Sequence, residues 1–206
     1  MQLAHPFRVV TSSVDGDVLA VLARADKQYS PGDVQRIVGR SVRGIRLSLQ
    51  RLAEQGVVLE QRTSTSVLYS LNTRHVAAVA LRALANLRST VIERTTNRMA
   101  SWDQPAAFAA LFGSAVRDDM QPDSDIDLFV VRTDAVDADD PAWRRQLEDL
   151  VEHLSAWTGN DTRVLEYAEL RVRQGREPVL AAITDQGVPV VGTMSWLRAA
   201  SSLPTI

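Results

Sequence analysis

Residues 112–131 read FGSAVRDDMQPDSDIDLFVV, and the second half of this stretch, DIDLFVV, has the composition of a buried β-strand. The strand begins with two carboxylates, Asp125 and Asp127, separated by a single residue. Successive side chains of a strand point to opposite faces of its sheet, so both carboxylates project from one face, close to each other. Like charges held this close repel, and the pair therefore predicts a positively charged partner between them.

The composition limits what this partner can be. The chain has 206 residues, of which 45% are hydrophobic, enough for one large domain or two small ones. It has no cysteine and only three scattered histidines, which excludes thiolate metal sites and a zinc-like cluster. A metal ion would be a hard cation with oxygen ligands. Neither a signal sequence nor a membrane-spanning run is visible, so we expect a cytoplasmic protein without a membrane partner.

Charge is distributed unevenly along the chain. Residues 1–101 contain 14 Lys and Arg against 7 Asp and Glu, whereas residues 102–206 contain 9 against 18. The two parts thus carry +7 and −9, although the whole chain carries only −2. Such an asymmetry indicates two parts with different partners, and the basic part is the candidate for binding a polyanion.

The basic part has the pattern of three helices followed by a hairpin. Apolar residues at helical spacing predict the helices, Ser30 and Ser41 provide N-terminal caps, and Gly39 and Gly56 provide helix ends. Two β-rich runs joined by the polar RTST predict the hairpin. The predicted helices and strands cover residues 15–25, 30–39, 41–56, 57–61 and 66–72. This order is typical of a winged helix-turn-helix, which we predict over residues 1–73.

The predicted third helix has a basic side. Arg40, Arg43 and Arg46 recur every three residues, roughly opposite the apolar stripe. Arg36 precedes them, and Arg62 lies in the loop of the hairpin. The planar guanidinium group contacts both phosphates and guanine edges, so these five arginines predict a DNA-binding surface. The alternative is an ordinary charged helix face, because winged helices also serve as protein-contact modules.

Residues 74–101 predict a long linker helix. Its apolar residues are spaced by four and three, which allows either a homodimer contact or packing onto the chain's own domains. This apolar seam consists of Val76, Ala80, Leu84, Leu87 and Val91. The change of charge and the segment WDQP, residues 102–105, mark the boundary to a second domain over residues 102–206.

Gly113 and Ser114 lie between a predicted strand and a predicted short helix. A glycine at this place lets the backbone approach a phosphate group, with free N–H groups directed at it, and the serine adds a hydroxyl donor. The dipeptide alone is a weak signal. Together with Asp125 and Asp127, which can hold metal ions that bridge phosphate oxygens, it predicts a site for phosphoryl-type transfer.

This spacing resembles the nucleotidyltransferase domain of the DNA polymerase beta superfamily in its minimal form. The residues that carry the resemblance are Gly113, Ser114, Arg117, Ser124, Asp125 and Asp127. The whole chain also resembles bacterial proteins that join a winged helix to such a domain. The resemblance implies an α+β fold with a mixed sheet flanked by helices. It also implies that the two aspartates bind Mg²⁺ or Mn²⁺, that the Gly-Ser turn with Arg117 and Ser124 holds a nucleoside triphosphate, and that a third carboxylate comes from a later strand.

The identity of that third carboxylate is open. We predict Glu166, within the apolar run TRVLEY, as the third catalytic acid, with Asp161 as the alternative. If the position falls at Arg163 instead, the site lacks its third acid and with it a base for activating the acceptor.

The sequence also departs from the family near the phosphate site. Arg117 is followed by Asp118 and Asp119, where the family has a small glycine, and these acids add negative charge close to the expected phosphates.

Three functions agree with these patterns. The first, which we expect, is Mg²⁺-dependent transfer of a nucleoside monophosphate from a nucleoside triphosphate to an unknown acceptor, which could be a protein, an RNA or a small molecule, with a DNA-binding winged helix. The second is a transcriptional regulator whose nucleotidyltransferase domain senses nucleotides or is inactive. The third is an antitoxin-like protein that modifies or binds a partner and represses its own operon.

Overall fold

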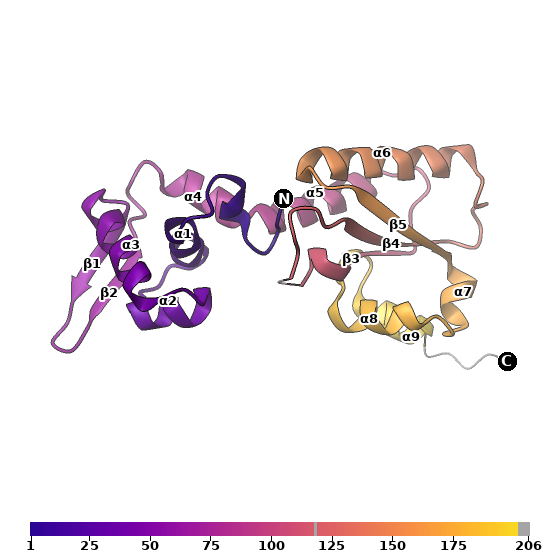
Figure 1. The fold of residues 1–206 in the computed structure, drawn as a ribbon. Coiled ribbons are helices and arrows are strands. Elements are labelled where there is room, and N and C mark those ends of the chain that lie inside the picture. Colours follow the sequence, from indigo (N-terminus) through magenta and orange to yellow (C-terminus); the bar gives the residue numbers. More distant parts are fainter. Residues whose placement is uncertain (118, 202–206) are drawn as a thin grey trace. The chain divides into compact units, whose positions relative to one another are not determined.

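The computed structural model describes residues 1–117 and 119–201, and its elements are labelled in Figure 1. The chain divides into two compact units, one of residues 5–88 and the other of residues 1–4 together with residues 89–206. No helix in the described ranges has the length and apolar character needed to cross a lipid bilayer.

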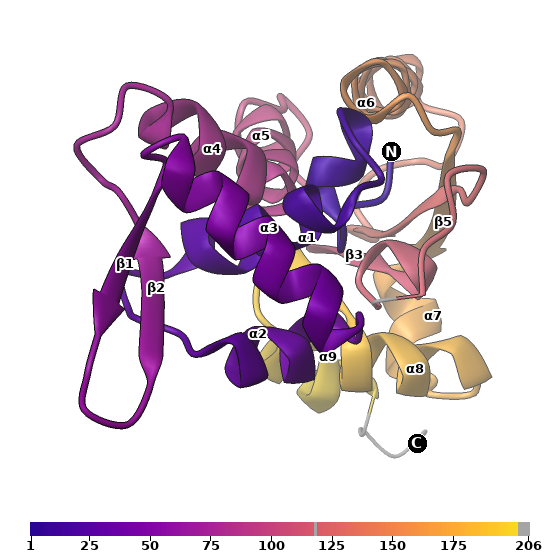
Figure 2. The same cartoon turned by 60° about the vertical axis from the view of Figure 1, so that its left-hand side comes forward.

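The first unit contains four α-helices and one hairpin within its described residues. Its elements are η1 (Pro6–Val9), α1 (Val14–Arg24), α2 (Pro31–Val38), α3 (Val42–Glu54), β1 (Val58–Arg62), β2 (Val67–Leu71) and α4 (Ala78–Ala85). Figure 2 shows the antiparallel hairpin of β1 and β2 together with α1, α2 and α3. The three helices and the hairpin predicted from the sequence are confirmed, with ends that differ by one or two residues.

Local sequence explains where these helices begin and end. Ser30 and Asp33 form a reciprocal capping box at the start of α2, and Gly39 ends this helix in the left-handed region with φ of 71°. Ser41 then caps α3 by accepting a hydrogen bond of 3.2 Å from the backbone N–H of Gly44. These two caps define the short turn between α2 and α3.

One apolar core holds the first unit together. Helices α1 and α3 and strand β2 contribute side chains that are almost completely buried in this core, among them Val18, Leu22, Ile45, Leu49 and Leu71. The segment between α1 and α2 joins the hairpin through Tyr29, which exchanges two backbone hydrogen bonds of 2.8 Å with Tyr69. The helices and the hairpin therefore form one packed unit.

The prediction of a single linker helix over residues 74–101 is wrong. Two helices lie there: α4, and α5 (Leu87–Ala100), which begins after Asn86. Asparagine is a poor helix former, and Asn86 has φ of −100° and ψ of 11°, outside the helical range. α4 packs into the core of the first unit, and α5 packs into that of the second.

The residues of the predicted apolar seam do not share one environment. Val76 precedes α4 and its exposed fraction is 94%, whereas Val91 of α5 is buried in the second unit. The seam is therefore not a continuous stripe, because the helix that would carry it is interrupted. The homodimer stays a prediction.

The second unit is a mixed four-stranded sheet covered by helices. Its elements are α5, β3 (Phe108–Phe112), η2 (Gly113–Ala115), β4 (Ile126–Arg132), α6 (Pro141–Thr158), β5 (Thr162–Ala168), α7 (Glu169–Arg173), α8 (Pro178–Gln186), β6 (Val188–Val191) and α9 (Met194–Ser201). The strand order is β5-β4-β3-β6, in which β4 and β5 are parallel and β3 runs antiparallel to both β4 and β6. The predicted α+β class with a mixed sheet and flanking helices is confirmed for this unit.

The two faces of this sheet pack against different helices, and Figure 1 shows α6 on one side and α8 and α9 on the other. Leu128 and Val130 of β4 pack in a cluster with α5 and α6, whereas Phe129 and Val131 pack in a second cluster with α7, α8 and α9. Because side chains alternate along a strand, Asp127 shares the face of Phe129 and Val131. The sheet therefore places this carboxylate on the α7–α9 side.

Candidate functional site

Asp127 lies beside the turn that follows β3. It is the ladder partner of Phe112, the residue before Gly113. A Cβ atom on Gly113 would lie less than 3.0 Å from Asp127 Oδ2, and the φ of Gly113 is +70°. Glycine at this position both adopts the left-handed conformation and leaves room for the carboxylate. The structure thus brings the Gly-Ser turn and the aspartate pair together.

The turn itself is shorter than the sequence predicted. Gly113–Ala115 form a three-residue 3₁₀ helix where the sequence predicted a short helix. Ser114 is partly exposed at this turn, and its hydroxyl makes no hydrogen bond with a described residue.

The other residues assigned to phosphate binding have local partners. Arg117 is exposed, and its Nε lies 3.2 Å from both carboxylate oxygens of Asp119. Asp119 thus neutralises the arginine that was expected to meet phosphate, whereas Asp118 lies outside the described residues. Ser124 Oγ accepts a hydrogen bond of 2.9 Å from the backbone N–H of Gln121 and closes the turn before β4.

Arg163 of β5 is the positive partner of the aspartates. It is the ladder partner of Asp127, and its Nε lies 2.8 Å from Asp125 Oδ2. Its neighbours at alternate positions, Leu165 and Tyr167, pack on the α7–α9 face, so Arg163 and both aspartates share this face. A guanidinium group therefore stands where a third carboxylate would face the pair.

The environment of Asp127 disfavours its ionised form. Partial burial raises the pKa of its carboxyl group above the ordinary value, and the nearby charge of Asp125 raises it further. Arg163 and Arg117 lower this pKa but do not cancel the increase. At Asp127, burial and the neighbouring carboxylate thus outweigh the two arginines.

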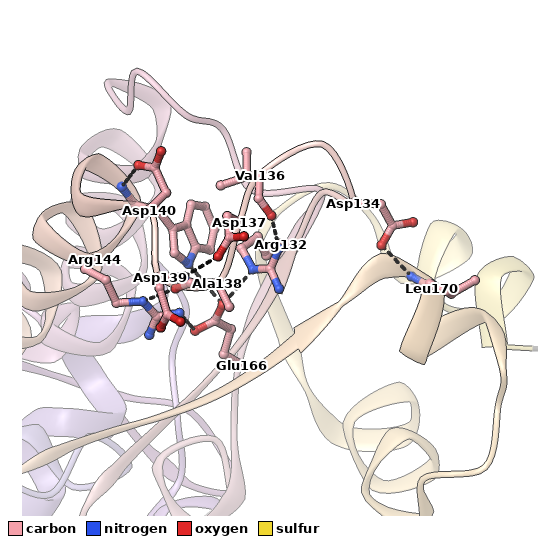
Figure 3. Close-up of polar contacts among 11 residues, drawn as sticks. Arg132, Asp134, Val136, Asp137, Ala138, Asp139, Asp140, Arg144, Glu166 and Leu170 are labelled. Atoms are coloured by element: carbon pink, nitrogen blue, oxygen red, sulfur yellow. Dashed lines mark hydrogen bonds and ion pairs between the residues drawn. The ribbon is translucent and has the colours of Figure 1, made fainter.

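Glu166 lies on the opposite face of the sheet. It is the ladder partner of Val130, three residues beyond Asp127, and its carboxylate is directed at α6 (Figure 3). Arg132 Nε and Trp143 Nε1 each donate to Oε1 at 3.0 Å, and Arg144 Nη2 donates to Oε2 at 2.6 Å. The structure does not bring Glu166 to the aspartate pair, and this corrects its assignment as the third acid.

The Glu166 cluster has a structural role instead. The guanidinium groups of Arg132 and Arg144 also donate to the backbone carbonyls of Val136 and Ala138, which lie in the loop between β4 and α6 (Figure 3). One partly buried carboxylate thus holds two arginines that fix this loop. Such a network stabilises only while all its members are present, because removing one leaves partly buried charges unpaired.

Two carboxylates make up the acidic donor set of the site. Within residues 1–117 and 119–201, no group of three or more Asp, Glu or His side chains could hold a metal ion. Asp125 and Asp127 remain as two carboxylates on one face. Mg²⁺ is commonly bound through one or two protein carboxylates together with substrate phosphates and water. The two residues therefore fit a cation that arrives with a triphosphate, and Arg163 is already paired with one of the two carboxylates.

Sequence reasoning missed the residues that hold the loop before β4. The buried Asn160 donates from Nδ2 to the carbonyls of Pro122 at 3.1 Å and Ser124 at 2.8 Å. Gln2, also buried, donates from Nε2 to the carbonyl of Met120 at 2.8 Å. These contacts connect positions far apart in the sequence, so no local pattern could have indicated them.

The five arginines predicted to bind DNA differ in their surroundings. Arg36 pairs with Asp33, Arg40 Nε lies 2.9 Å from Asp17, and Arg62 Nε lies 2.8 Å from Glu60. Arg43 and Arg46 of α3 are exposed and form no ion pair with any described side chain. The buried side of α3, with Ile45 and Leu49, faces the core. Of the five predicted arginines, Arg43 and Arg46 are thus exposed and have no acidic partner among the described side chains.

One family model matches a segment of this chain. Residues 95–186 match the Polbeta family, described as polymerase beta, nucleotidyltransferase. The matched segment lies in the second unit and contains the Gly113 turn, both aspartates and Arg163. No curated protein matches the chain.

Two solved structures resemble part of the chain. One is a toxin–antitoxin with AMP-PNP, at 17% sequence identity, and the other is a mutant of the toxin–antitoxin MntA-HpeT, at 14%. Each similarity covers 53% of this chain and 80% of the other chain, with a TM-score of 0.37.

Proposed function

We propose that this protein is a DNA-binding regulator whose second unit binds a nucleoside triphosphate with Mg²⁺ but transfers no nucleoside monophosphate from it. The observation that carries this proposal is the ion pair between Arg163 and Asp125. It puts a cation where a third acid would be needed to accept the proton of an attacking hydroxyl group. The structure thereby favours the second of the functions expected from the sequence over the first.

The nucleotide site in this proposal consists of the turn after β3 and the start of β4. Backbone N–H groups at Gly113 and the hydroxyl group of Ser114 bind phosphate oxygens, and Arg117 adds charge when it leaves Asp119. Asp125 and Asp127 bind Mg²⁺, or Mn²⁺, and Ser124 shapes the turn that precedes them. When bound, the cation neutralises the phosphate oxygens.

The DNA-binding surface in this proposal is the exposed side of α3. The order of α1, α2, α3 and hairpin, with the short turn between α2 and α3, agrees with a winged helix-turn-helix. In that motif the second helix of the turn enters the major groove, and here this helix presents Arg43 and Arg46. Arg36, Arg40 and Arg62 are expected to contact phosphates once DNA competes with their carboxylate partners.

A second candidate function is the transfer reaction itself, with a protein, an RNA or a small molecule as acceptor. The close approach of Gly113 to Asp127, with both aspartates on one face, favours it. This candidate requires that a group outside the described cluster, or the acceptor, supplies the base.

Equilibrium binding of a nucleoside triphosphate with Mg²⁺ tests the proposal. We expect wild-type protein to bind the nucleotide with Mg²⁺. The double variant Asp125→Ala plus Asp127→Ala should bind it at least about tenfold more weakly, because two charged carboxylates that hold the cation are removed. Calorimetry measures this loss. Asp103→Ala plus Asp185→Ala is the matched control, since it removes the same charge from positions of the same unit outside the aspartate pair.

Incubation with labelled ATP, CTP, GTP or UTP, Mg²⁺ and cell extract separates the two candidates. The regulator is expected to show no label transfer with any nucleotide. Transfer that disappears in the Asp125→Ala plus Asp127→Ala variant would contradict the regulator and support the enzyme.

A further inference from the structure

Arg163 differs from the other arginines of the second unit in its relation to the aspartates. Among residues 1–117 and 119–201, the ion pair of Arg163 with Asp125 is the only one that involves Asp125 or Asp127. Arg132 and Arg144 pair with Glu166 on the opposite face, and Arg117 pairs with Asp119. Arg163 is thus the guanidinium group in direct contact with the aspartate pair.

The backbone of Arg163 is fixed, but its side chain is not enclosed. The β4–β5 ladder is continuous from Ile126 and Thr162 to Arg132 and Ala168, so Arg163 keeps its place beside Asp127. Its side chain is 74% exposed, whereas that of Asp125 is 26% exposed. An exposed ion pair of this kind is weak and exchanges readily, because solvent screens it and both side chains retain freedom.

A guanidinium group binds carboxylates and phosphates with the same planar arrangement of donors. While Arg163 holds Oδ2 of Asp125, a divalent cation competes with it for this carboxylate. When a triphosphate lies on the same face, its oxygens offer Arg163 another partner and leave Asp125 to the cation. The divalent cation and the triphosphate then bind cooperatively.

We propose that Arg163 is a built-in competitor of the divalent cation at Asp125, which makes cation binding conditional on a nucleoside triphosphate. This rests on the proposed function, since it assigns the metal ligands as above. The cation alone binds weakly, and the nucleotide raises its affinity by engaging Arg163. Arg163 is thus a specificity-determining residue that distinguishes the cation–nucleotide complex from the free cation.

Titration with Mn²⁺, followed by electron paramagnetic resonance of the free ion, tests this in the full chain without nucleotide. We expect Arg163→Ala to bind Mn²⁺ about two- to fivefold more tightly than wild type, the factor that an exposed ion pair contributes. Arg163→Asp places a third carboxylate beside Asp127 and is expected to tighten binding by about tenfold or more. Arg173→Ala and Arg173→Asp are the controls, because Arg173 is a half-exposed arginine of the same unit that pairs with Glu169.

A second titration adds a non-hydrolysable nucleoside triphosphate. In wild-type protein the nucleotide should increase Mn²⁺ affinity by a larger factor than in Arg163→Ala, because the competitor is absent from the variant. Equal Mn²⁺ affinity of wild type, Arg163→Ala and Arg163→Asp would overturn the proposal. So would a nucleotide effect of the same size in wild type and Arg163→Ala.

The two proposals fail in different ways. If wild-type protein binds no nucleotide and the Asp125→Ala plus Asp127→Ala variant binds Mn²⁺ as wild type does, the proposed site is wrong. If nucleotide binding depends on the aspartates but Arg163 substitutions leave Mn²⁺ affinity unchanged, only the role of Arg163 is wrong. Thermal unfolding checks each variant, and Arg163→Gln replaces Arg163→Asp if the latter is not folded.

Discussion

Gly113 is the residue on which the position of Asp127 depends most directly. Its φ of +70° belongs to the left-handed region, and Asp127 Oδ2 occupies the space that a side chain would need. The alternation of side chains along β4 predicted the face on which Asp127 lies. The pairing of Phe112 with Asp127 in the β3–β4 ladder then brings this carboxylate beside Gly113.

Gly113→Ala is expected to destabilise the protein by about 1–3 kcal/mol, since it combines a strained backbone with a displaced carboxylate. Urea unfolding measures the loss, and calorimetry should show weaker nucleotide binding. Gly159→Ala is the matched control, because Gly159 has a similar φ of 68° but open space where a side chain would begin. Equal losses of stability in both variants, with nucleotide binding intact, would show that the contact with Asp127 is unimportant.

The raised pKa of Asp127 predicts a stability effect that depends on pH. Because the folded state disfavours the ionised carboxylate, ionisation of Asp127 lowers the free energy of unfolding at about pH 7, and this penalty disappears as the pH falls through the raised pKa toward about pH 4. We expect Asp127→Asn to be more stable than wild type at neutral pH and to lose this advantage in acid. Urea unfolding across this pH range measures both.

Asp125→Asn is the control for this effect, since Asp125 forms the ion pair with Arg163. It should show no comparable gain at neutral pH. A gain for Asp127→Asn that stays constant with pH would mean that ionisation of Asp127 is not its cause.

At the scale of elements, α3 combines two requirements of a DNA-binding helix. One side is anchored by Ile45 and Leu49, and the exposed side carries Arg43 and Arg46 without acidic partners among the described residues. The helical period predicted both sides from the sequence. It could not show that Arg40 is paired, because its partner Asp17 belongs to α1 and is brought near only by the packing of the unit.

Arg43→Ala plus Arg46→Ala should weaken DNA binding at every sequence tested and lower the slope of log K against log salt by about 1.8, if each contacts one phosphate. Fluorescence anisotropy at several salt concentrations measures both quantities. The control is Arg145→Ala plus Arg176→Ala, which removes the same charge from exposed positions of the second unit. An unchanged slope in the α3 variant would remove this helix from the interface.

The break between α4 and α5 shows where element prediction from sequence failed. The apolar spacing continues across Asn86, so periodicity alone predicted one helix. The two halves belong to different cores, with Ala78 and Ala85 in the first and Val91 and Met99 in the second. Tertiary packing therefore overrode a local pattern, as is common where helix propensity is weak.

At the scale of the whole molecule, the chain passes between its two units twice. It leaves the second unit after residue 4, builds the first unit to residue 88, and returns. Leu3 is 1% exposed in the core of the second unit, and Gln2 bonds the loop that precedes Asp125. Two covalent connections thus join the unit with the predicted DNA-binding helix to the one with the proposed nucleotide site.

If the protein is such a regulator, we expect binding of the nucleotide and binding of DNA to be coupled. The nucleotide with Mg²⁺ should change DNA affinity by about 5- to 150-fold, and DNA should change nucleotide affinity by the same factor, because coupling free energies are reciprocal. Anisotropy and calorimetry measure the two sides. Asp125→Ala plus Asp127→Ala should keep the DNA affinity of the nucleotide-free protein and lose the response, whereas identical DNA binding with and without nucleotide in wild type would contradict a regulatory role.

Local periodicity and capping were sufficient to predict the helices of the first unit, the strand that carries Asp127 and the placement of Asp125 and Asp127 on one face. The tertiary structure alone decided that Arg163 rather than Glu166 faces the aspartates, since the choice depends on the register of β5 against β4. It also decided that residues 1–4 belong to the second unit. Register and long-range packing depend on the whole fold, and no local pattern encodes them.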